Sequence, residues 1–407
     1  MTAMTTSTRS RCEALLVKLH GEMRAGRGEE HRAEELRSEM AALWSDLTDD
    51  EATCFDEISE DLYFIEGQRV VVPLEDGETA ETVLLELAKA FKAQEDRRAL
   101  GLTRKLPSVD ARTAYVIARC WERLGFPRAA VCFYDFANEL EPKAWYEAAA
   151  LEALVRAGGL DEAAERAEAI EKRAVVSGTL LLAIASVLQR AAASGDEHQR
   201  HSIYQRVVQM VEAAWDDSTA LASARAMGLL AAGFSYQHLG KPDLALQSFE
   251  RAVGVHPSEG PLLSRGLALL HIDRPRALRD ITSAVKVGTK FDWPYLYAVL
   301  HALEAGRLAE AERFCEAGVD VAKSPEVRGR LFEWWAIAAA GLGRTPEEVT
   351  ALFDKATAEL PLDLVIRNNV HRYLVSLKIE RVLTANDWEL DRQIDEAKAW
   401  ASFAPAA

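Results

Sequence analysis

Three arginines are spaced so that they would project from one side of a helix. Arg112, Arg119 and Arg123 are separated by seven and four residues, and this spacing aligns side chains along a helix face. Guanidinium groups gathered in this way could bind a carboxylate or a phosphorylated peptide. Ion pairing with nearby acidic side chains is the alternative, because the chain carries a surplus of acids.

Two other groups have the donor atoms of a cation site but not its full spacing. Glu197, His198 and His201 could share one helix turn and offer ligands to a metal ion, yet no third His or Cys is near in the sequence. The segment Asp46–Glu57 mimics part of a calcium loop, but Glu51 stands where that loop requires glycine. We therefore expect no metal site and no cofactor.

The sequence carries no recognisable catalytic pattern. Gly341-x-Gly343 lacks a preceding strand and a following Lys-Ser or Lys-Thr pair, so it indicates a turn between helices and not a phosphate-binding loop. There is no Gly-x-Ser-x-Gly, no His-Glu-x-x-His and no carboxylate pair that stands out from the charged helix faces. We expect a protein that is not an enzyme.

Composition favours helices throughout. Of the 407 residues, 49% are apolar, alanine and leucine dominate, and glycine is sparse. The net charge is −16, and no Lys or Arg occurs between residues 38 and 68, where acidic residues gather. Such a chain would repel phosphate backbones, so we expect no nucleic-acid partner.

Cysteine usage and hydropathy place the expected protein in the cytoplasm. The five cysteines form no Cys-x-x-Cys pair and are odd in number, which is typical of a reducing compartment. No apolar signal-peptide core is present near the N-terminus. The longest uncharged run, 174–189, is too short for a comfortable membrane span and predicts one buried helix. We expect no membrane association.

The first 75 residues predict a small acidic helical region. Residues 1–10 are polar and expected to be disordered, and breaks at 66–67 and 73–77 place a domain boundary near 75. Thr48 and Glu51 form a capping-box pattern at the start of the third helix. The run 69–73 is short and stopped by proline, so it predicts an extended linker. The helices expected in this 11–75 region are Cys12–Ala25, Glu30–Trp44 and Glu51–Ile65.

Two segments, 114–142 and 229–257, share one spacing of small, aromatic and turn residues. The common order is a small residue, an aromatic three positions on, a glycine turn, a second small residue, an aromatic four positions on, and a proline. The small residues let two helices approach, the glycine closes the hairpin, and the proline ends the second helix. The residues are Ala114, Ile117, Ala118, Trp121, Gly125, Ala130, Tyr134, Ala137 and Pro142, and Leu229, Ala232, Gly233, Tyr236, Gly240, Ala245, Phe249, Ala252 and Pro257.

With weaker copies around them, these segments make residues 80 to 375 resemble the tetratricopeptide repeat family. The resemblance implies an all-α fold, an α-α superhelix in which a TPR-like solenoid of helical hairpins has an inner groove that holds peptides or helices. We expect about seven hairpins over 76–380, following the acidic region 11–75. A capping helix, starting at Asn386 and reaching about Phe403, is expected within the C-terminal segment 381–407.

The groove of such an array would be lined by first-helix residues that are not used for packing within the hairpin. This lining is mostly aromatic and aliphatic, and it lacks the Lys and Asn set with which the resembled chaperone-binding members hold a C-terminal carboxylate. It would suit an amphipathic helix or an apolar peptide. A register error of one residue, or filling of the groove by the protein's own terminal helix, are the alternatives. The candidates are Arg112, Tyr115, Arg119, Trp145, Leu230, Phe234, Trp293, Leu296, Leu300 and Trp334.

The leading hypothesis for function is a non-catalytic scaffold or adaptor that binds a protein or peptide partner in this groove. The alternative is a peptide-sensing regulatory protein whose N-terminal helical region is the effector. The acidity of residues 38–68 argues against DNA contact by that region. An enzyme with an unrecognised helical site is the third and least favoured hypothesis.

Overall fold

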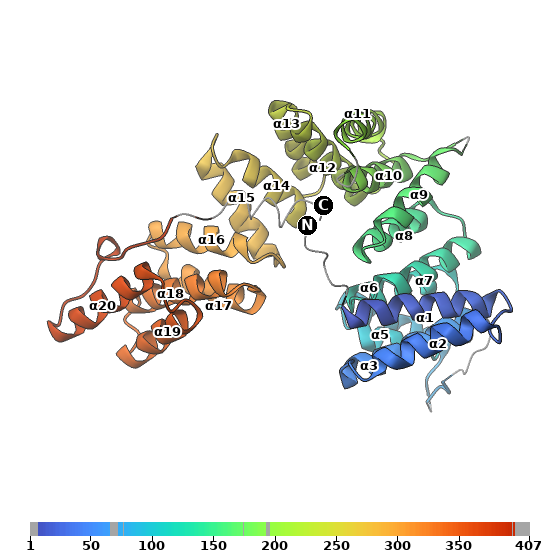
Figure 1. Ribbon diagram of the computed structural model, residues 1–407, viewed down its shortest axis with the longest axis horizontal. Helices are drawn as coiled ribbons and strands as arrows, with labels where there is room; N and C mark the ends of the chain where they lie inside the picture. Colours follow the sequence, from blue (N-terminus) through green and yellow to red (C-terminus); the bar gives the residue numbers. More distant parts are fainter. Residues whose placement is uncertain are drawn as a thin grey trace. The chain divides into compact units, whose positions relative to one another are not determined.

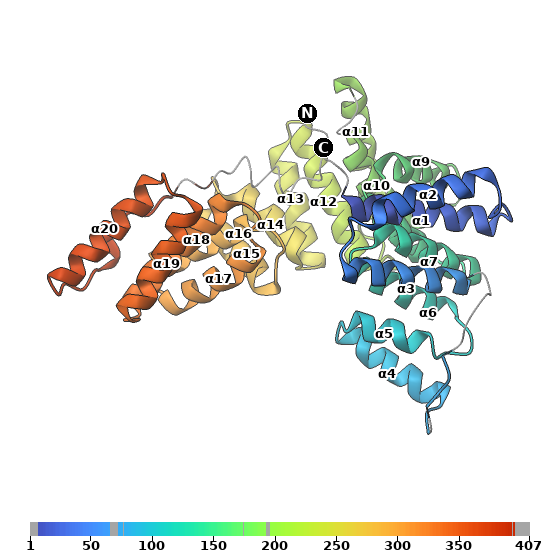
Figure 2. The ribbon, with the colours of Figure 1, turned by 60° about the horizontal axis from the view of Figure 1, so that its bottom comes forward.

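The computed structural model describes residues 7–65, 72–75, 77–173, 175–192, 196–392 and 394. All regular structure in these residues is helical, which confirms the predicted all-α class (Figures 1 and 2). The helices are α1 Thr8–Arg24, α2 His31–Trp44, α3 Asp49–Ile65, α4 Ala80–Lys92, α5 Asp96–Thr103, α6 Ala111–Arg123, α7 Pro127–Leu140, α8 Ala144–Arg156, α9 Leu160–Glu171, α10 Gly178–Ala191, α11 Glu197–Ala214, α12 Ala222–His238, α13 Pro242–Val255, α14 Glu259–Leu269, α15 Arg274–Val287, α16 Trp293–Glu304, α17 Leu308–Val321, α18 Pro325–Gly341, α19 Pro346–Glu359 and α20 Leu364–Lys378.

Consecutive helices pair into antiparallel hairpins at the predicted repeats. Gly125 and Gly240 close the turns between α6 and α7 and between α12 and α13, with φ of +86° and +68°, a region that other residues resist. The second helices α7 and α13 end before Pro142 and Pro257, as the sequence predicted. The same pairing continues at α8/α9, α14/α15, α16/α17 and α18/α19.

Gly233 explains why the repeat needs a small residue in its first helix. A Cβ atom built on Gly233 would lie 2.3 Å from Cε1 of Phe249, whose ring is fully buried in the facing helix. No side chain fits at that distance, so α12 and α13 approach as closely as they do only because position 233 carries none. Small and aromatic residues therefore meet across the hairpin.

The described chain divides into two compact units. Unit 1 comprises residues up to Ala191 together with Glu212–Leu221, and unit 2 comprises Ala192–Val211 and the residues from Ala222 onward. The division falls in the stretch 178–225, where the repeat spacing is poorest. The boundaries proposed from sequence at 75 and 380 stay predictions.

The N-terminal helices of unit 1 pack directly on α7. Arg9 donates hydrogen bonds to the carbonyls of Leu124 and Gly125 at 2.8 and 2.6 Å, and its guanidinium lies 4.2 Å from the centre of the Phe126 ring. The Glu13 carboxylate accepts a hydrogen bond from the Ala129 amide at 3.0 Å. This region is therefore joined to the first well-matched hairpin and shares its core.

Burial of Glu13 makes the stability of unit 1 depend on pH. Burial raises the pKa of its carboxyl from 4.5 to about 7, because the charged form is disfavoured, while the Ala129 amide acts in the opposite direction. The folded state then holds a proton that the unfolded chain has released, so stability is highest below about pH 4.5 and falls as pH rises to about 7.

We expect Glu13→Gln to remove this dependence. The free energy of unfolding of the variant, relative to wild type, should rise by up to about 3 kcal/mol between about pH 4.5 and pH 7, since one pKa unit is worth about 1.4 kcal/mol. Urea unfolding across this range measures the difference, with the exposed Glu29→Gln as matched control. A difference that stays constant with pH would contradict the prediction.

A second buried carboxylate links α3 to α6. Asp61 is 3% exposed and accepts hydrogen bonds from Arg104 Nε at 2.8 Å, from Arg104 Nη2 at 3.2 Å and from Trp121 Nε1 at 2.9 Å. Burial raises the pKa of Asp61, and the Arg104 guanidinium acts against that rise. The acidic region thus contributes one anion to a closed polar contact inside unit 1.

Several local predictions agree with the structure. Thr48 and Glu51 form the expected capping box, because the Glu51 amide donates to Thr48 Oγ1 at 3.3 Å and the Thr48 amide donates to Glu51 Oε2 at 3.0 Å. The uncharged run near 180 forms the buried helix α10. None of the described helices is both long and apolar enough to cross a membrane.

Other predictions are corrected. Residues 8–10 form the first turn of α1 rather than a disordered tail, and residues 1–6 lie outside the described residues. The helical period at 81–99 is split between α4 and α5 by a turn at Gln94, whose φ is +59°. The prediction of a linker at 69–73 is not among the corrected ones, since the residues from Val72 onward are neither helix nor strand and 69–71 lie outside the described residues.

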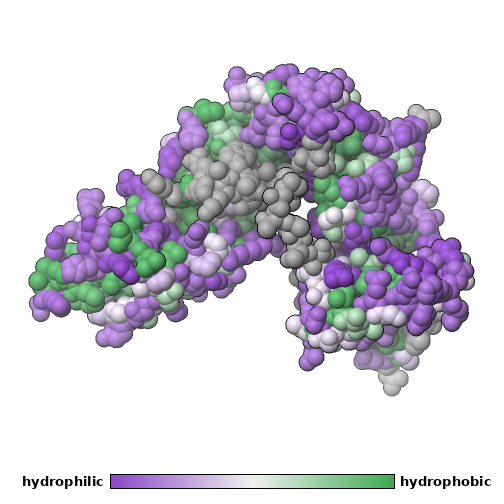
Figure 3. All heavy atoms as spheres, in the orientation of Figure 1, coloured by the Kyte–Doolittle hydropathy of each residue, from purple (hydrophilic) through white to green (hydrophobic). Residues whose placement is uncertain are grey.

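The expected helix from Asn386 onward is also wrong for the described residues. Thr384 and Asp387 cap only a short 3-10 turn, η2 Ala385–Asp387, with the Thr384 amide 2.8 Å from Asp387 Oδ2. Residues 388–392 and 394 are non-helical, and 393 and 395–407 lie outside the described residues. No helix after α20 pairs with it in the described chain. Apolar side chains remain exposed along α20 and just beyond its end, among them Leu374, Leu377 and Ile379 (Figure 3).

Candidate functional site

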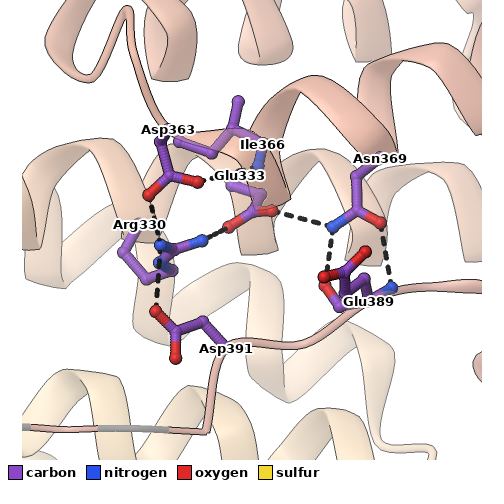
Figure 4. A network of polar contacts seen from close by, with 7 residues as sticks. All are labelled: Arg330, Glu333, Asp363, Ile366, Asn369, Glu389 and Asp391. Carbon is purple, nitrogen blue, oxygen red and sulfur yellow. Dashed lines mark hydrogen bonds and ion pairs between the residues drawn. The ribbon is translucent and has the colours of Figure 1, made fainter.

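A buried polar cluster lies on α18 and α20 of unit 2. Ser324 caps α18 by accepting from the Val327 amide at 3.1 Å, and Asp363 caps α20 by accepting from the Ile366 amide at 3.0 Å. These two caps fix the residues at which α18 and α20 begin, and so which side chains of the two helices face each other. They bring together Arg330, Glu333, Asp363 and Asn369, of which Glu333 and Asn369 are fully buried and Arg330 is 9% exposed (Figure 4).

Arg330 is the cation at the centre of this cluster. Its guanidinium pairs with Glu333, with Asp363 Oδ2 at 2.7 Å and with Asp391 Oδ2 at 3.1 Å. Burial raises the pKa of the Glu333 carboxyl to about 7, while Arg330 and the Asn369 amide act to lower it. Asp391 is the member of the cluster that comes from outside the helices.

Asn369 forms hydrogen bonds with the main chain of a neighbouring segment. Its Nδ2 donates to the Glu389 carbonyl at 2.7 Å, and the Glu389 amide donates to its Oδ1 at 2.9 Å (Figure 4). Its Nδ2 also donates to Glu333 Oε1 at 2.8 Å, so the amide is held by the helix next to it. A reciprocal pair of this kind resembles strand pairing and needs no particular side chain at position 389.

The segment held in this way is here called the strap, and it comprises residues 383–392 together with Ile394. It leaves α20, turns, and returns along that helix in the opposite direction, so that Trp388 meets Tyr373 and Glu389 meets Asn369. The Trp388 ring lies 6.2 Å from the Phe353 ring and 6.4 Å from the Tyr373 ring. Arg392 reaches Glu304 of α16 at 3.3 Å. The strap thus crosses α16, α18 and α20, the face on which a groove was predicted.

Several predicted groove residues of unit 2 are buried in its helical core and line no open surface. Trp334 is fully buried among residues of α16 to α19, and Phe234, Trp293, Leu296 and Leu300 are each less than a tenth exposed. The cause on α18 is a register error of one residue. Each step along a helix turns the side chain by about 100°, so Glu333 faces the strap while Trp334 points into the core. Leu230 is half-buried and packs near Gly260.

The predicted residues of unit 1 lie closer to the surface. Tyr115 and Trp145, from α6 and α8, are half-buried and touch edge to face at 4.7 Å, and Arg112 is exposed. Arg119 pairs with Glu122 at 2.6 Å and Arg123 pairs with Asp96 at 2.6 Å. Two of the three aligned arginines therefore bind acids of the same unit, which was the alternative to a ligand site.

Sequence reasoning missed Arg330, Glu333 and Asn369. Their signal was present, since asparagine is a poor helix former and Asn369 lies in the interior of α20. A polar side chain that occupies a buried helical position needs a hydrogen-bond partner, and Asn369 finds one in the main chain of Glu389.

The stacked hairpins and their small-to-aromatic contacts define a helical-repeat fold of the tetratricopeptide type. No protein-family model and no curated protein matches the chain. Among solved structures it is similar to yeast Tom70, at 12% identity and TM-score 0.30 over 80% of this chain and 75% of that one. It is also similar to the C-terminal part of a TPR repeat-containing protein from Cytophaga hutchinsonii, at 14% identity and TM-score 0.30 over 69% and 96%. The P58(IPK) TPR domain is 15% identical, with TM-score 0.23 over 74% and 89%.

Proposed function

We propose that the chain is a non-catalytic interaction scaffold that binds an extended segment of a partner protein across α16, α18 and α20. The observation that carries the proposal is the reciprocal main-chain pairing of Asn369 with Glu389. A fully buried asparagine that offers both a donor and an acceptor to a passing backbone is suited to extended peptide and not to a helix, whose main-chain groups are already paired. This differs from the amphipathic helix favoured by the sequence.

The side chains around Asn369 favour a segment with acidic and aromatic residues. Arg330 supplies a buried positive charge for one carboxylate, and Arg372 lies 3.4 Å from the Glu389 carboxylate. Phe353 and Tyr373 supply a surface for an aromatic ring. On this face the carboxylates of residues 389 and 391 meet Arg372 and Arg330, although Glu333 and Asp363 also pair with Arg330 and the chain as a whole carries a charge of −16. An acidic extended segment fits it better than a basic one.

A labelled peptide with the sequence of residues 383–394 tests this proposal directly. The host is the full chain carrying Trp388→Ala and Asp391→Ala, which weakens the strap and leaves the helices unchanged. We expect saturable binding by fluorescence anisotropy, and at least about ten-fold weaker binding of a peptide N-methylated at the Glu389 position, because methylation removes the main-chain donor to Asn369. A peptide of the same composition in scrambled order is the control.

Two neighbouring asparagines supply a matched pair of variants. In the same host, Asn369→Ala should abolish binding, whereas Asn368→Ala should change it little, because Asn368 reaches only the Glu389 side chain, at 3.2 Å. Circular dichroism checks that each variant keeps its helices. If the host stays folded and binds no more of the 383–394 peptide than of the scrambled one, the proposal is wrong.

A further inference from the structure

We infer that the strap is a built-in competitor for the site across α16, α18 and α20, so that this site is closed until a partner segment of matching chemistry displaces residues 388–391. This inference rests on the proposed function, because it assumes that the face under the strap is a binding site. It adds that the site is already occupied by the chain itself, and it specifies the pattern of side chains that a partner must carry.

The strap has the properties of a bound ligand rather than of a structural helix. It is non-helical from Trp388 to Arg392, and its main chain pairs with a side chain of the array. Of its residues only Trp388 is buried, at 9% exposure, while Glu389, Leu390 and Asp391 are half-buried. The strap adds Trp388 to the edge of the core, with Leu383, Leu390 and Ile394 packed against that core, and it can leave without breaking a helix because it contains none from Trp388 onward.

The connection between α20 and the strap is loosely packed. Glu380 has a φ of +52°, and Val382 is 85% exposed. A cavity of about 310 Å³ lies between the end of α20 and the start of the strap, with Val375, Ile379 and Leu383 in its lining. The exposed Val382 can act as the hinge on which the strap lifts once the contacts of Arg372 and Arg381 with Asp387 break.

The strap's own contacts give the chemistry of the partner. An aromatic side chain would replace Trp388 against Phe353 and Tyr373. The next residue is selected only weakly, because Asn369 bonds to the main chain there and only the exposed contacts of Asn368 and Arg372 reach its side chain. Next comes an apolar side chain, since Leu390 packs on the core, and then an acid for Arg330. The partner segment is thus extended and reads aromatic, weakly selected, apolar, acidic.

A tethered competitor suppresses binding strongly. The strap is joined to α20 by a few residues, which corresponds to an effective concentration on the order of 1 mM. A free peptide that makes the same contacts must compete with that concentration, and its apparent affinity falls by the fraction of time that the site is open. We expect at least about ten-fold weaker binding by the wild-type chain than by a chain with a weakened strap.

The experiment compares the labelled 383–394 peptide on the wild-type chain and on the full chain carrying Trp388→Ala and Asp391→Ala. The expected result is tight, saturable binding by the variant and at least about ten-fold weaker binding by wild type. Equal binding by both chains would overturn the strap as a competitor and leave the proposed function standing. No binding by either folded chain would overturn both.

The partner pattern has its own test. Peptides in which the residues corresponding to Trp388 or Asp391 are replaced by alanine should each lose at least about ten-fold in affinity for the variant chain, and replacement of Glu389 should cost much less. Equal losses at all three positions would overturn the pattern.

Cleavage of a folded chain whose residues 383–392 are unchanged avoids any effect of strap substitutions on folding. A recognition sequence for a specific protease, placed at the exposed Val382, allows the strap to be cut from α20 after the chain has folded. Cleavage should turn a weakly binding chain into a tightly binding one once the released segment is removed. If cleaved and uncleaved chains bind the labelled peptide equally, the strap is not a competitor.

Discussion

Replacing Asp61 by alanine is expected to lower the free energy of unfolding of unit 1 by about 3 to 5 kcal/mol. The carboxylate accepts hydrogen bonds from Arg104 and Trp121. The Asp61 and Trp121 side chains are buried between α3 and α6. Alanine would leave the Arg104 guanidinium largely buried without its main counterion and the indole N–H of Trp121 without its acceptor. A largely buried charge that loses its main counterion costs far more than the ion pair itself contributes.

Glu60→Ala is the matched control for this substitution. Glu60 precedes Asp61, its side chain is 72% exposed, and its carboxylate lies 3.9 Å from the same guanidinium. Its removal should change the stability by no more than about 0.5 kcal/mol, because exposed ion pairs contribute little. Urea unfolding followed by circular dichroism measures both losses, and amide hydrogen exchange locates them in α3 and α6. Equal losses would show that Asp61 has no special role.

Gly233→Leu should lower the free energy of unfolding by about 1 to 3 kcal/mol or more. Even the first carbon of a side chain would lie 2.3 Å from the Phe249 ring, and leucine would add three further carbons to the same place. The two helices must separate or the buried ring must leave its position, and both outcomes lose close packing. A thermal melt of the variant measures the effect.

The control lies in the other helix of the same hairpin. Gly254 of α13 has no atom within 4 Å of the place where a Cβ would lie. Gly254→Ala should therefore stabilise the chain by up to about 1 kcal/mol, because alanine is the better helix former. If Gly233→Leu melts at the wild-type temperature, the proposed contact between α12 and α13 is wrong.

The hairpins could be predicted because their signals are local and repeated. Gly125, Gly240, Pro142 and Pro257 determine where helices turn and end, and each acts through the backbone of its own segment. The capping box of Thr48 and Glu51 is equally local. Gly233 could be assigned to a close helix contact because glycine inside an apolar helix is otherwise unfavourable.

The candidate site could not be predicted in the same way, because it depends on rotation and on distant pairing. The register predicted for α18 was wrong by one residue. Trp334, which is a core residue, was therefore proposed for the site in place of Glu333, which makes the polar contact. The strap was expected to be a helix, since the periodicity of Leu390 and Ile394 fits one. Its extended form comes from the pairing of Glu389 with Asn369, twenty residues earlier, which no local pattern encodes.

The contact between Glu13 and Ala129 has a consequence for folding during synthesis on the ribosome. The two residues are 116 positions apart, so the first helix leaves the exit tunnel long before the amide it needs has been made. At a synthesis rate of roughly 5 to 20 residues per second, the wait lasts about 6 to 23 s. During that time Leu15 and Leu19 of α1 can pack on Ala33 and Leu36 of α2, but Glu13 has no α7 beside it. We expect nascent chains shorter than about 130 residues to depend on chaperones more than longer ones do.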